Sequence, residues 1–185
     1  MSYSIASQAR PMDNPLAASE GKFVVPPALE AEANELISHY PVKRSATLML
    51  LHEVQEHFGY ISREAVDWIA AKLDLQPINV FEVVTFYPMF RQVPAGKFQF
   101  KVCRTLSCAL GGSAQLRKHL CEKFGLDDHS HGLQTTQDGK FSVEFVECLA
   151  SCGTAPVMMI NEEFHEGVTP AKADELISRC GGLKP

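Results

Sequence analysis

Four of the six cysteines stand in two close pairs whose spacing suits a metal cluster. Cys103 and Cys108 form a C-x4-C pair, and Cys148 and Cys152 form a C-x3-C pair. Two thiolates this close can bind one metal when the backbone between them wraps around it, and four thiolates are the usual ligands of a [2Fe–2S] cluster. A structural zinc ion also takes four cysteines, although paired C-x2-C is its more familiar spacing. The spacing favours iron and sulfur and leaves a zinc-stabilised interaction module as an alternative.

We expect no second chemistry in this chain, because the motifs that other activities need are absent. A thioredoxin-type thiol–disulfide protein, our third alternative, uses C-x2-C at a helix start, which this sequence lacks. Gly111-Gly112 does not match the G-x-G-x-x-G phosphate loop. No nucleophile is paired with a general base, since the cysteines best placed for reactivity are those of the two pairs. We therefore expect no substrate or nucleotide site in this chain alone.

The remaining cysteines and a histidine pair are weaker candidates for a site. Cys121 and Cys180 fall beside or on the apolar stripes of predicted helices, where a core thiol is the simpler interpretation and a functional disulfide the alternative. His129-Ser130-His131 could bind a metal, but no further ligands are evident nearby. A solvated loop is the simpler interpretation of this segment.

Composition indicates a globular protein of a reducing compartment. The chain has 185 residues, of which 45% are hydrophobic, and a net charge of −5. Its 17 Lys and Arg residues are scattered, which argues against nucleic-acid binding. No apolar run approaches the roughly 20 residues of a membrane span, and residues 1–21 resemble neither a signal nor a transit peptide. We expect a cytoplasmic protein without direct membrane insertion.

The first half of the chain predicts an arm followed by helices. Residues 1–26 are proline-rich with little periodicity, which predicts an extended arm. Residues 27–90 carry four apolar stripes at helical spacing, and we predict a helical bundle, with Ser45 capping its second helix and Gly59 ending it. An aromatic group in its last helix could form either a docking surface or bundle core: Phe81, Phe86, Tyr87 and Phe90.

Residues 91–185 change from helical to strand periodicity and predict a small sheet flanked by two helices. Alternation over residues 98–102 predicts a strand that ends at Cys103, and Asp138-Gly139 predicts a hairpin turn before a strand that runs into Cys148. Two further strands and a helix that begins at Thr169-Pro170 and stops at Gly181 complete the order β-α-β-β-β-α. The overall fold class is α+β, with both cysteine loops at strand ends, where a rigid sheet suits a cofactor.

With these motifs in view, the sequence resembles the thioredoxin-like [2Fe–2S] subunit of NADH:quinone oxidoreductase, respiratory complex I. The resemblance covers roughly residues 45–179. It rests on the segments His57–Ile61 and Val80–Phe90, and on the two cysteine pairs, the second of which is followed by Ala155-Pro156. It implies a thioredoxin-like α/β [2Fe–2S] ferredoxin domain after the helical bundle.

The resemblance also implies the cofactor and the partners. In that family the cysteines that match Cys103, Cys108, Cys148 and Cys152 ligate one [2Fe–2S] cluster, each pair holding one iron. The family member is an electron-transfer subunit that associates tightly with the subunit binding NADH, FMN and a [4Fe–4S] cluster. Their complex lies in the peripheral arm, at the inner face of the plasma membrane. Similar subunits serve NAD-linked hydrogenases and formate dehydrogenases, which are therefore alternative assemblies.

Arg104, inside the first cysteine loop, is a candidate for tuning the cluster. An oxidised cluster with four thiolates carries a charge of about −2, and reduction makes it more negative, so a nearby cation favours the reduced state. We hypothesise that Arg104 raises the reduction potential. An ordinary solvated loop arginine is the alternative, and an unchanged midpoint in Arg104→Gln would support it.

Overall fold

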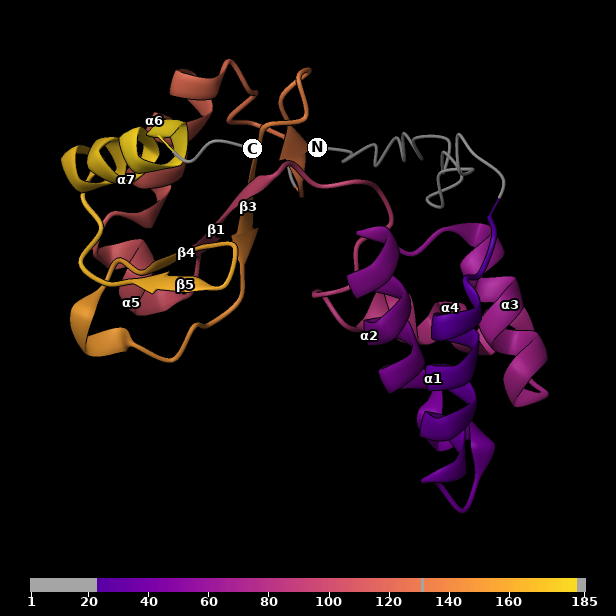
Figure 1. Cartoon of the computed structure of the whole chain (residues 1–185). Helices are drawn as coiled ribbons and strands as arrows, with labels where there is room; N and C mark the ends of the chain where they lie inside the picture. Colours follow the sequence, from indigo (N-terminus) through magenta and orange to yellow (C-terminus); the bar gives the residue numbers. More distant parts are fainter. Residues whose placement is uncertain (1–22, 131, 183–185) are drawn as a thin grey trace, which may run out of the picture. The chain divides into compact units, whose positions relative to one another are not determined.

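A computed structural model describes residues 23–130 and 132–182 of the chain (Figure 1). The chain divides between Pro94 and Ala95 into two compact units, each with its own hydrophobic core. Of the predicted arm, residues 1–22 lie outside the described residues. The part of the chain that the structure describes contains no helix long and apolar enough to cross a membrane.

The first unit is built from helices that share one core. They are α1 (Pro27–Ser38), α2 (Thr47–Phe58), α3 (Arg63–Leu73) and α4 (Pro77–Phe86), with a short 3-10 turn, η1 (Lys43–Ala46), before α2. The most deeply buried large side chains of this core come from three of the helices and the turn after α2: Leu50, Leu51, Val54, Ile61, Ile69, Val80 and Val84.

The predicted end of the second helix is in place, whereas its predicted cap is wrong. Gly59 ends α2 in the left-handed conformation (φ 81°), and its N–H donates to the Gln55 carbonyl at 2.8 Å. Ser62 Oγ caps α3 by accepting the Ala65 N–H. The prediction that Ser45 caps α2 is wrong, because Ser45 lies inside η1, which runs directly into α2 without a side-chain cap.

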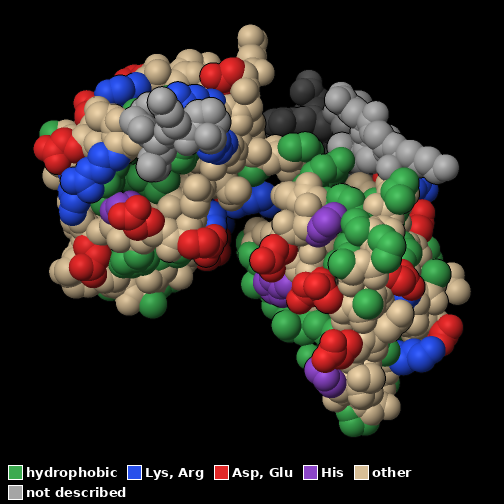
Figure 2. Space-filling view, in the orientation of Figure 1, with side chains coloured by type: hydrophobic (Ala, Val, Ile, Leu, Met, Phe, Trp, Pro, Cys, Tyr) green, Lys and Arg blue, Asp and Glu red, His purple; other side chains and the backbone are tan. Residues whose placement is uncertain are grey.

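Helix α4 is apolar around most of its circumference, so the structure divides its aromatic residues between core and surface. Phe90, just beyond the helix, is buried, whereas Phe86 is 74% exposed. Ile78 and Met89 are also exposed, and hydrophobic side chains can be seen on the surface in Figure 2. Burial in the core therefore accounts for only part of the aromatic group.

The second unit holds a mixed five-stranded sheet in the order β2-β3-β1-β4-β5. The strands are β1 (Phe98–Cys103), β2 (Gln134–Thr135), β3 (Phe141–Val146), β4 (Met158–Ile160) and β5 (Glu163–His165). Only β1 and β3 are parallel, and every other neighbouring pair is antiparallel.

Two long helices contribute to the core of this sheet, and two short ones lie in the cysteine loops. Helices α6 (Ser113–Phe124) and α7 (Pro170–Gly182) contact each other, as Figure 1 shows, and share a core with Phe100, Val102 and Val143. The short helices are α5 (Leu106–Leu110) and the 3-10 turn η2 (Cys152–Thr154).

The predicted order of elements is close to the observed one but lacks β2, α5 and the short turn η2. The hairpin turn at Asp138-Gly139 is confirmed, yet its first arm pairs as a separate strand, β2. The segment between Cys103 and Cys108, predicted as a loop, contains the start of α5. The predicted start at Thr169-Pro170 is confirmed, with the Lys172 N–H donating to Thr169 Oγ1 at 3.2 Å, and α7 continues one residue beyond the predicted stop at Gly181.

Candidate metal-cluster site

The two parallel strands bring both cysteine pairs to the same edge of the sheet. Cys103 is the last residue of β1 and lies opposite Val146, the last residue of β3. One residue later, the Arg104 N–H donates to the Val146 carbonyl at 3.0 Å. Because the carboxyl ends of parallel neighbours lie at one edge, the loops that carry the first and second pairs start side by side.

The first pair is buried. Cys103 and Cys108 are 1% and 2% exposed, and they form a small apolar cluster with Val157, against which Leu149 of the second loop packs. Helix α5 carries Cys108, and Thr105, which precedes that helix, lies with its hydroxyl 3.3 Å from Cys103 Sγ.

The second pair lies at the surface. Cys148 and Cys152 are both exposed, and neither is in a disulfide. Ala150 adopts a positive φ of 61°, and its N–H donates to Cys148 Sγ at 3.3 Å. Cys152 begins η2, which leads away from the pair, so Ala150 with its positive φ lies between the two thiols.

Hydrogen bonds and burial act in opposite directions on the buried thiols. Burial raises the pKa of Cys103, but hydrogen bonds from the Thr105 hydroxyl and from the backbone N–H groups of Leu149 and Thr105 lower it below its usual value. Burial raises the pKa of Cys108, and the neighbouring Cys103 and Cys152 raise it further, against a hydrogen bond from the Val157 backbone. The second loop thus reaches the buried thiols through Leu149, which also packs against them.

Gly111 allows the end of α5 to approach the second loop. A Cβ atom at this position would lie 3.2 Å from the Ala155 carbonyl carbon and from the Pro156 nitrogen. By contrast, a Cβ atom at Gly153, inside the second loop, would meet open space. The missing side chain at Gly111 therefore leaves room for the backbones of α5 and the second loop to lie close together.

An ion pair that the sequence did not suggest joins the two cysteine loops. The Arg104 guanidinium binds the carboxylate of Glu147, which directly precedes Cys148, with Nε 2.9 Å from Oε1. Both side chains are 57% exposed. The positive charge that we expected to act on a cluster is therefore accompanied by a negative one.

The second loop has another polar partner that sequence reasoning missed. Glu166, in the loop after β5, accepts hydrogen bonds from the hydroxyls of Ser151 and Thr154, which lower its pKa. Ser151 and Thr154 stand beside Cys152 in the sequence, and these two hydroxyls were the only signal that could have suggested a polar contact there.

The other candidate residues lie elsewhere in the second unit. Cys121 and Cys180 are buried in the core shared by α6 and α7, and burial raises the pKa of each thiol. His129 is exposed beside Asp128, with Nε2 3.5 Å from Oδ1, and His131 lies outside the described residues. The carbonyl groups of Asp128 and Ser130 accept hydrogen bonds from Arg117.

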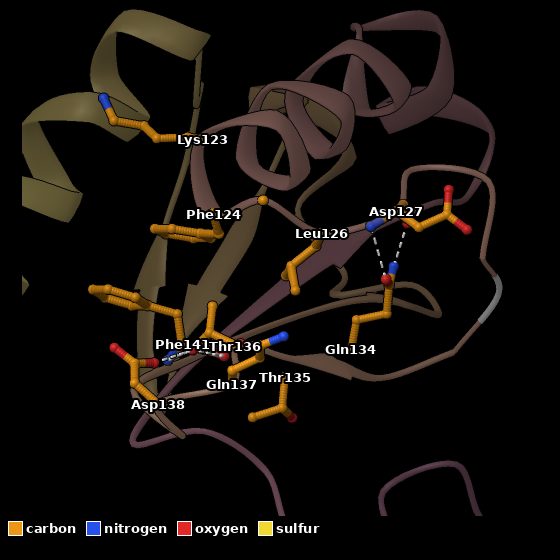
Figure 3. A pocket seen from close by; sticks show the side chains of 11 residues that line it. Lys123, Phe124, Leu126, Asp127, Gln134, Thr135, Thr136, Gln137, Asp138 and Phe141 are labelled. Atoms are coloured by element: carbon orange, nitrogen blue, oxygen red, sulfur yellow. Dashed lines mark hydrogen bonds between the residues drawn. The ribbon is translucent and has the colours of Figure 1, made fainter.

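A hollow of about 780 Å³ lies between the end of α6 and the β2–β3 hairpin, away from the cysteines. In Figure 3 the rings of Phe124 and Phe141 lie parallel, with their centroids 4.4 Å apart. The Gln134 side chain is already bonded to the backbone N–H and carbonyl of Asp127. No cysteine lines this hollow, so it is separate from the candidate cluster site.

The four paired thiols fit the needs of a two-iron cluster. All four are free cysteines, and thiolate sulfur is the usual protein ligand of such a cluster. Over residues 23–130 and 132–182, no three Cys, His, Asp or Glu side chains converge as ligands of one ion. A cluster in which each iron takes two protein thiolates requires two neighbouring pairs, and the loops that carry the pairs follow the paired ends of β1 and β3.

Comparisons with known proteins match this chain to one family model and to several relatives. Residues 33–181 match the family model of the thioredoxin-like [2Fe–2S] ferredoxins. The chain is 40% identical over 147 residues to an NADH-quinone oxidoreductase subunit of Thermus thermophilus, covering 78% of this chain and 79% of the relative. It is 38% identical over 150 residues to an NADH-quinone oxidoreductase subunit of Rickettsia bellii, covering 80% of this chain and 87% of the relative.

A solved structure shares the fold. A chain of NAD+-reducing [NiFe]-hydrogenase superposes with a TM-score of 0.62 and 24% identity, over 75% of this chain and 23% of the hydrogenase chain. This chain thus spans about a quarter of that longer polypeptide. At this level of identity the likeness concerns the fold alone.

Proposed function

The chain belongs to the thioredoxin-like [2Fe–2S] ferredoxin family, and from this membership we propose that Cys103, Cys108, Cys148 and Cys152 ligate one [2Fe–2S] cluster. The observation that carries the proposal is that the parallel strands β1 and β3 deliver both pairs to one edge of the sheet. Each pair would hold one iron. When bound, such a cluster takes up and releases one electron at a time.

The protein contributes an asymmetric environment to this exchange. Buried Cys103 and Cys108 keep water away from two of the four sulfur ligands. Exposed Cys148 and Cys152 leave the other side of the site accessible to a partner. Backbone N–H groups near the sulfurs, such as that of Ala150, stabilise negative charge on the thiolates.

The names of the relatives support a role in NADH oxidation. Because relatives at 38 to 40% identity are subunits of NADH-quinone oxidoreductase, we assign this chain as the electron-transfer subunit of the NADH-oxidising module. Its partner would bind NADH, FMN and a [4Fe–4S] cluster, and its own cluster would exchange electrons with that FMN. The chain then functions as part of an enzyme, in the peripheral arm at the inner face of the plasma membrane.

The two units would have different roles within that assembly. The second unit, which contains all four paired cysteines, would hold the cluster. The helices of residues 27–90 would form a separate bundle that supplies contact area to the partner, together with the arm of residues 1–26. Exposed apolar side chains on and beside α4, such as Phe86 and Met89, support this role.

Metal analysis and electron paramagnetic resonance of the anaerobically purified chain test the cluster. We expect about two irons per chain and an S = 1/2 signal after reduction with dithionite. About one zinc per chain without such a signal would instead establish the zinc-stabilised module, because Zn²⁺ has a filled d shell and no redox chemistry.

Purification of the tagged chain from its native cells tests the assembly. Co-purification of an NADH- and FMN-binding subunit with quinone-reductase subunits supports our assignment, whereas hydrogenase or formate dehydrogenase subunits would contradict it.

A further inference from the structure

Glu166 holds the second cysteine loop from both sides of Cys152. Its Oε1 accepts a hydrogen bond from Ser151 Oγ at 2.6 Å and another from Thr154 Oγ1 at 2.8 Å. Ser151 is the residue before Cys152, and Thr154 is the second residue after it. A single carboxylate oxygen therefore binds both flanks of this cysteine.

The backbone around Glu166 follows the same loop. The Gly167 N–H donates to the Thr154 carbonyl at 2.7 Å, and the next residue, Val168, donates to the Pro156 carbonyl at 2.8 Å. Lys172 Nζ in turn donates to the Glu166 carbonyl at 2.6 Å. These bonds tie the β5–α7 connection, and with it the Glu166 side chain, to the cysteine loop.

Packing alone gives this cysteine little support. Cys152, Gly153 and Thr154 are all exposed, and none of them belongs to a buried core cluster. In contrast, Cys103 and Cys108 are fixed by burial against Val157. The position of Cys152 therefore depends on the hydrogen bonds of its loop far more than the positions of the buried cysteines do.

We propose that Glu166 is a positioning residue that orients Cys152 for metal ligation through Ser151 and Thr154. The proposal deepens the proposed function, because it takes Cys152 as a cluster ligand. Hydrogen bonds to a carboxylate are about twice as strong as neutral ones. Partners that orient metal ligands typically change metal affinity by about 10- to 100-fold when they are removed. Because Glu166 is exposed, we expect an effect near the lower limit of this range.

The test compares the rate at which a chelator removes iron from the full-length, cluster-loaded chain and from its variants. Glu166→Ala removes the acceptor, and the double variant Ser151→Ala/Thr154→Val removes both donors. Glu166→Gln keeps an Oε1 acceptor and loses only the charge. Glu162→Ala is the matched control, since Glu162 is an exposed carboxylate of the β4–β5 turn whose ion-pair partner is Lys101.

We expect Glu166→Ala and the double variant each to release iron about tenfold faster than the wild type, without a further increase when they are combined. Residues that act through the same hydrogen bonds are non-additive in this way, whereas independent sites multiply. Glu162→Ala should stay within about twofold of the wild type, and Glu166→Gln, which keeps only neutral hydrogen bonds, should lie between the wild type and Glu166→Ala. Wild-type release rates in Glu166→Ala, multiplicative effects, or a Glu166→Gln variant as labile as Glu166→Ala would each overturn the proposal.

Amide hydrogen exchange of the cluster-free, full-length chain provides an independent test. Glu166→Ala should speed exchange in peptides covering residues 150–155 and leave the strands β1 and β3 unchanged. Unchanged exchange in residues 150–155 would overturn the proposal. Faster exchange throughout the second unit would also overturn it, because Glu166 would then stabilise the whole unit and not this loop in particular. If the wild-type chain binds no iron, the proposed function fails, but this exchange experiment still decides whether Glu166 holds the loop.

Discussion

The four paired cysteines have the same chemistry but different surroundings. Cys103 and Cys108 are buried beside Val157, and Cys148 and Cys152 are exposed in a loop held by hydrogen bonds. A ligand is defined by what its sulfur binds, not by burial, so the two pairs should be equally necessary for the cluster.

Replacement of single cysteines tests this equivalence. We expect Cys103→Ala, Cys108→Ala, Cys148→Ala and Cys152→Ala each to lose most of the bound iron, because a two-iron cluster needs four protein ligands. Cys180→Ala is the matched control, since Cys180 is a buried free thiol of the α7 core. Iron content and visible absorbance measure the result, and a Cys148→Ala chain with a full complement of iron would contradict the assignment.

The Arg104–Glu147 ion pair makes the hypothesis that Arg104 raises the reduction potential easier to test. If both charges act on the cluster, Arg104→Gln should lower the midpoint potential and Glu147→Gln should raise it. The double variant should lie near the wild type, because it removes one charge of each sign. Both side chains are more than half exposed, so the shifts should shrink as salt is added. Redox titration of the wild type and the three variants measures the midpoint potentials. Unchanged midpoint potentials in both single variants would show that the ion pair only links the two loops.

His165 should make stability depend on pH. Its side chain is 9% exposed and its Nε2 has no hydrogen-bond partner among the described residues. Burial lowers the pKa of His165, against the opposing charge of Glu163, while Lys172 and Arg179 lower it further. The unfolded chain therefore binds a proton first as the pH falls below about 6.5. Stability is complete above that pH and is lost as the pH falls from there toward the folded-state pKa.

Denaturant unfolding at pH 7.5 and 5.5 checks this expectation. The wild type should lose more stability over this range than His165→Leu, which cannot titrate. His129→Gln removes an exposed histidine and serves as the control that should keep the wild-type dependence. Equal pH dependence in the wild type and His165→Leu would show that this histidine does not contribute.

At the residue level, the sequence was sufficient to find the cysteines but not their partners. The four cysteines and the spacing of their two pairs can be read directly from the sequence. Glu147 and Glu166 bind across the fold, the first to a residue 43 positions away and the second to Ser151 and Thr154. Such contacts depend on which loops the sheet brings together, and no local pattern encodes them.

At the level of elements, the site depends on how closely α5 and the second cysteine loop approach. Gly111 ends α5, and a Cβ atom there would lie 3.2 Å from backbone atoms of Ala155 and Pro156. Backbone atoms cannot rotate away as the end of a flexible side chain can. A methyl group at this position should therefore push the two cysteine loops apart.

Gly111→Ala should destabilise the second unit by about 1–3 kcal/mol, the usual range for an overpacked site, and should speed iron loss. Gly153→Ala is the control within the second cysteine loop, because its Cβ atom would meet open space. Denaturant unfolding and iron release measure both effects. A Gly111→Ala variant as stable as Gly153→Ala would show that the loops can adjust without cost.

The elements were predicted best where local signals and tertiary contacts agree. Gly59 and the Asp138-Gly139 hairpin are strong local signals, and both are in place. Ser45 is a good cap in isolation, but the 3-10 turn that leads into α2 incorporates it. Helix α5 has only five residues, too few for an apolar period to show, so its existence depends on the fold around Cys108.

At the level of the whole molecule, the described residues form one large hydrophobic core in each of the two units. The core of the first unit is formed by α1 to α4 and η1, and the core of the second by the sheet with α6 and α7. All four paired cysteines, both ion-pair residues of the site and Glu166 fall after Pro94. Periodicity predicted this change from helix to strand, because the two halves bury apolar residues at different spacings.

Because the second unit has its own core and every proposed ligand, a chain reduced to residues 95–185 should fold and retain its cluster. A domain of this size buries enough surface to be stable, although with less margin than the whole chain. We expect about two irons per fragment and the same electron paramagnetic resonance signal as the full chain. The fragment should, however, bind the partner subunit less tightly, since it lacks the helical unit. A fragment that folds by circular dichroism but holds no iron would mean that the first unit contributes directly to the cluster site.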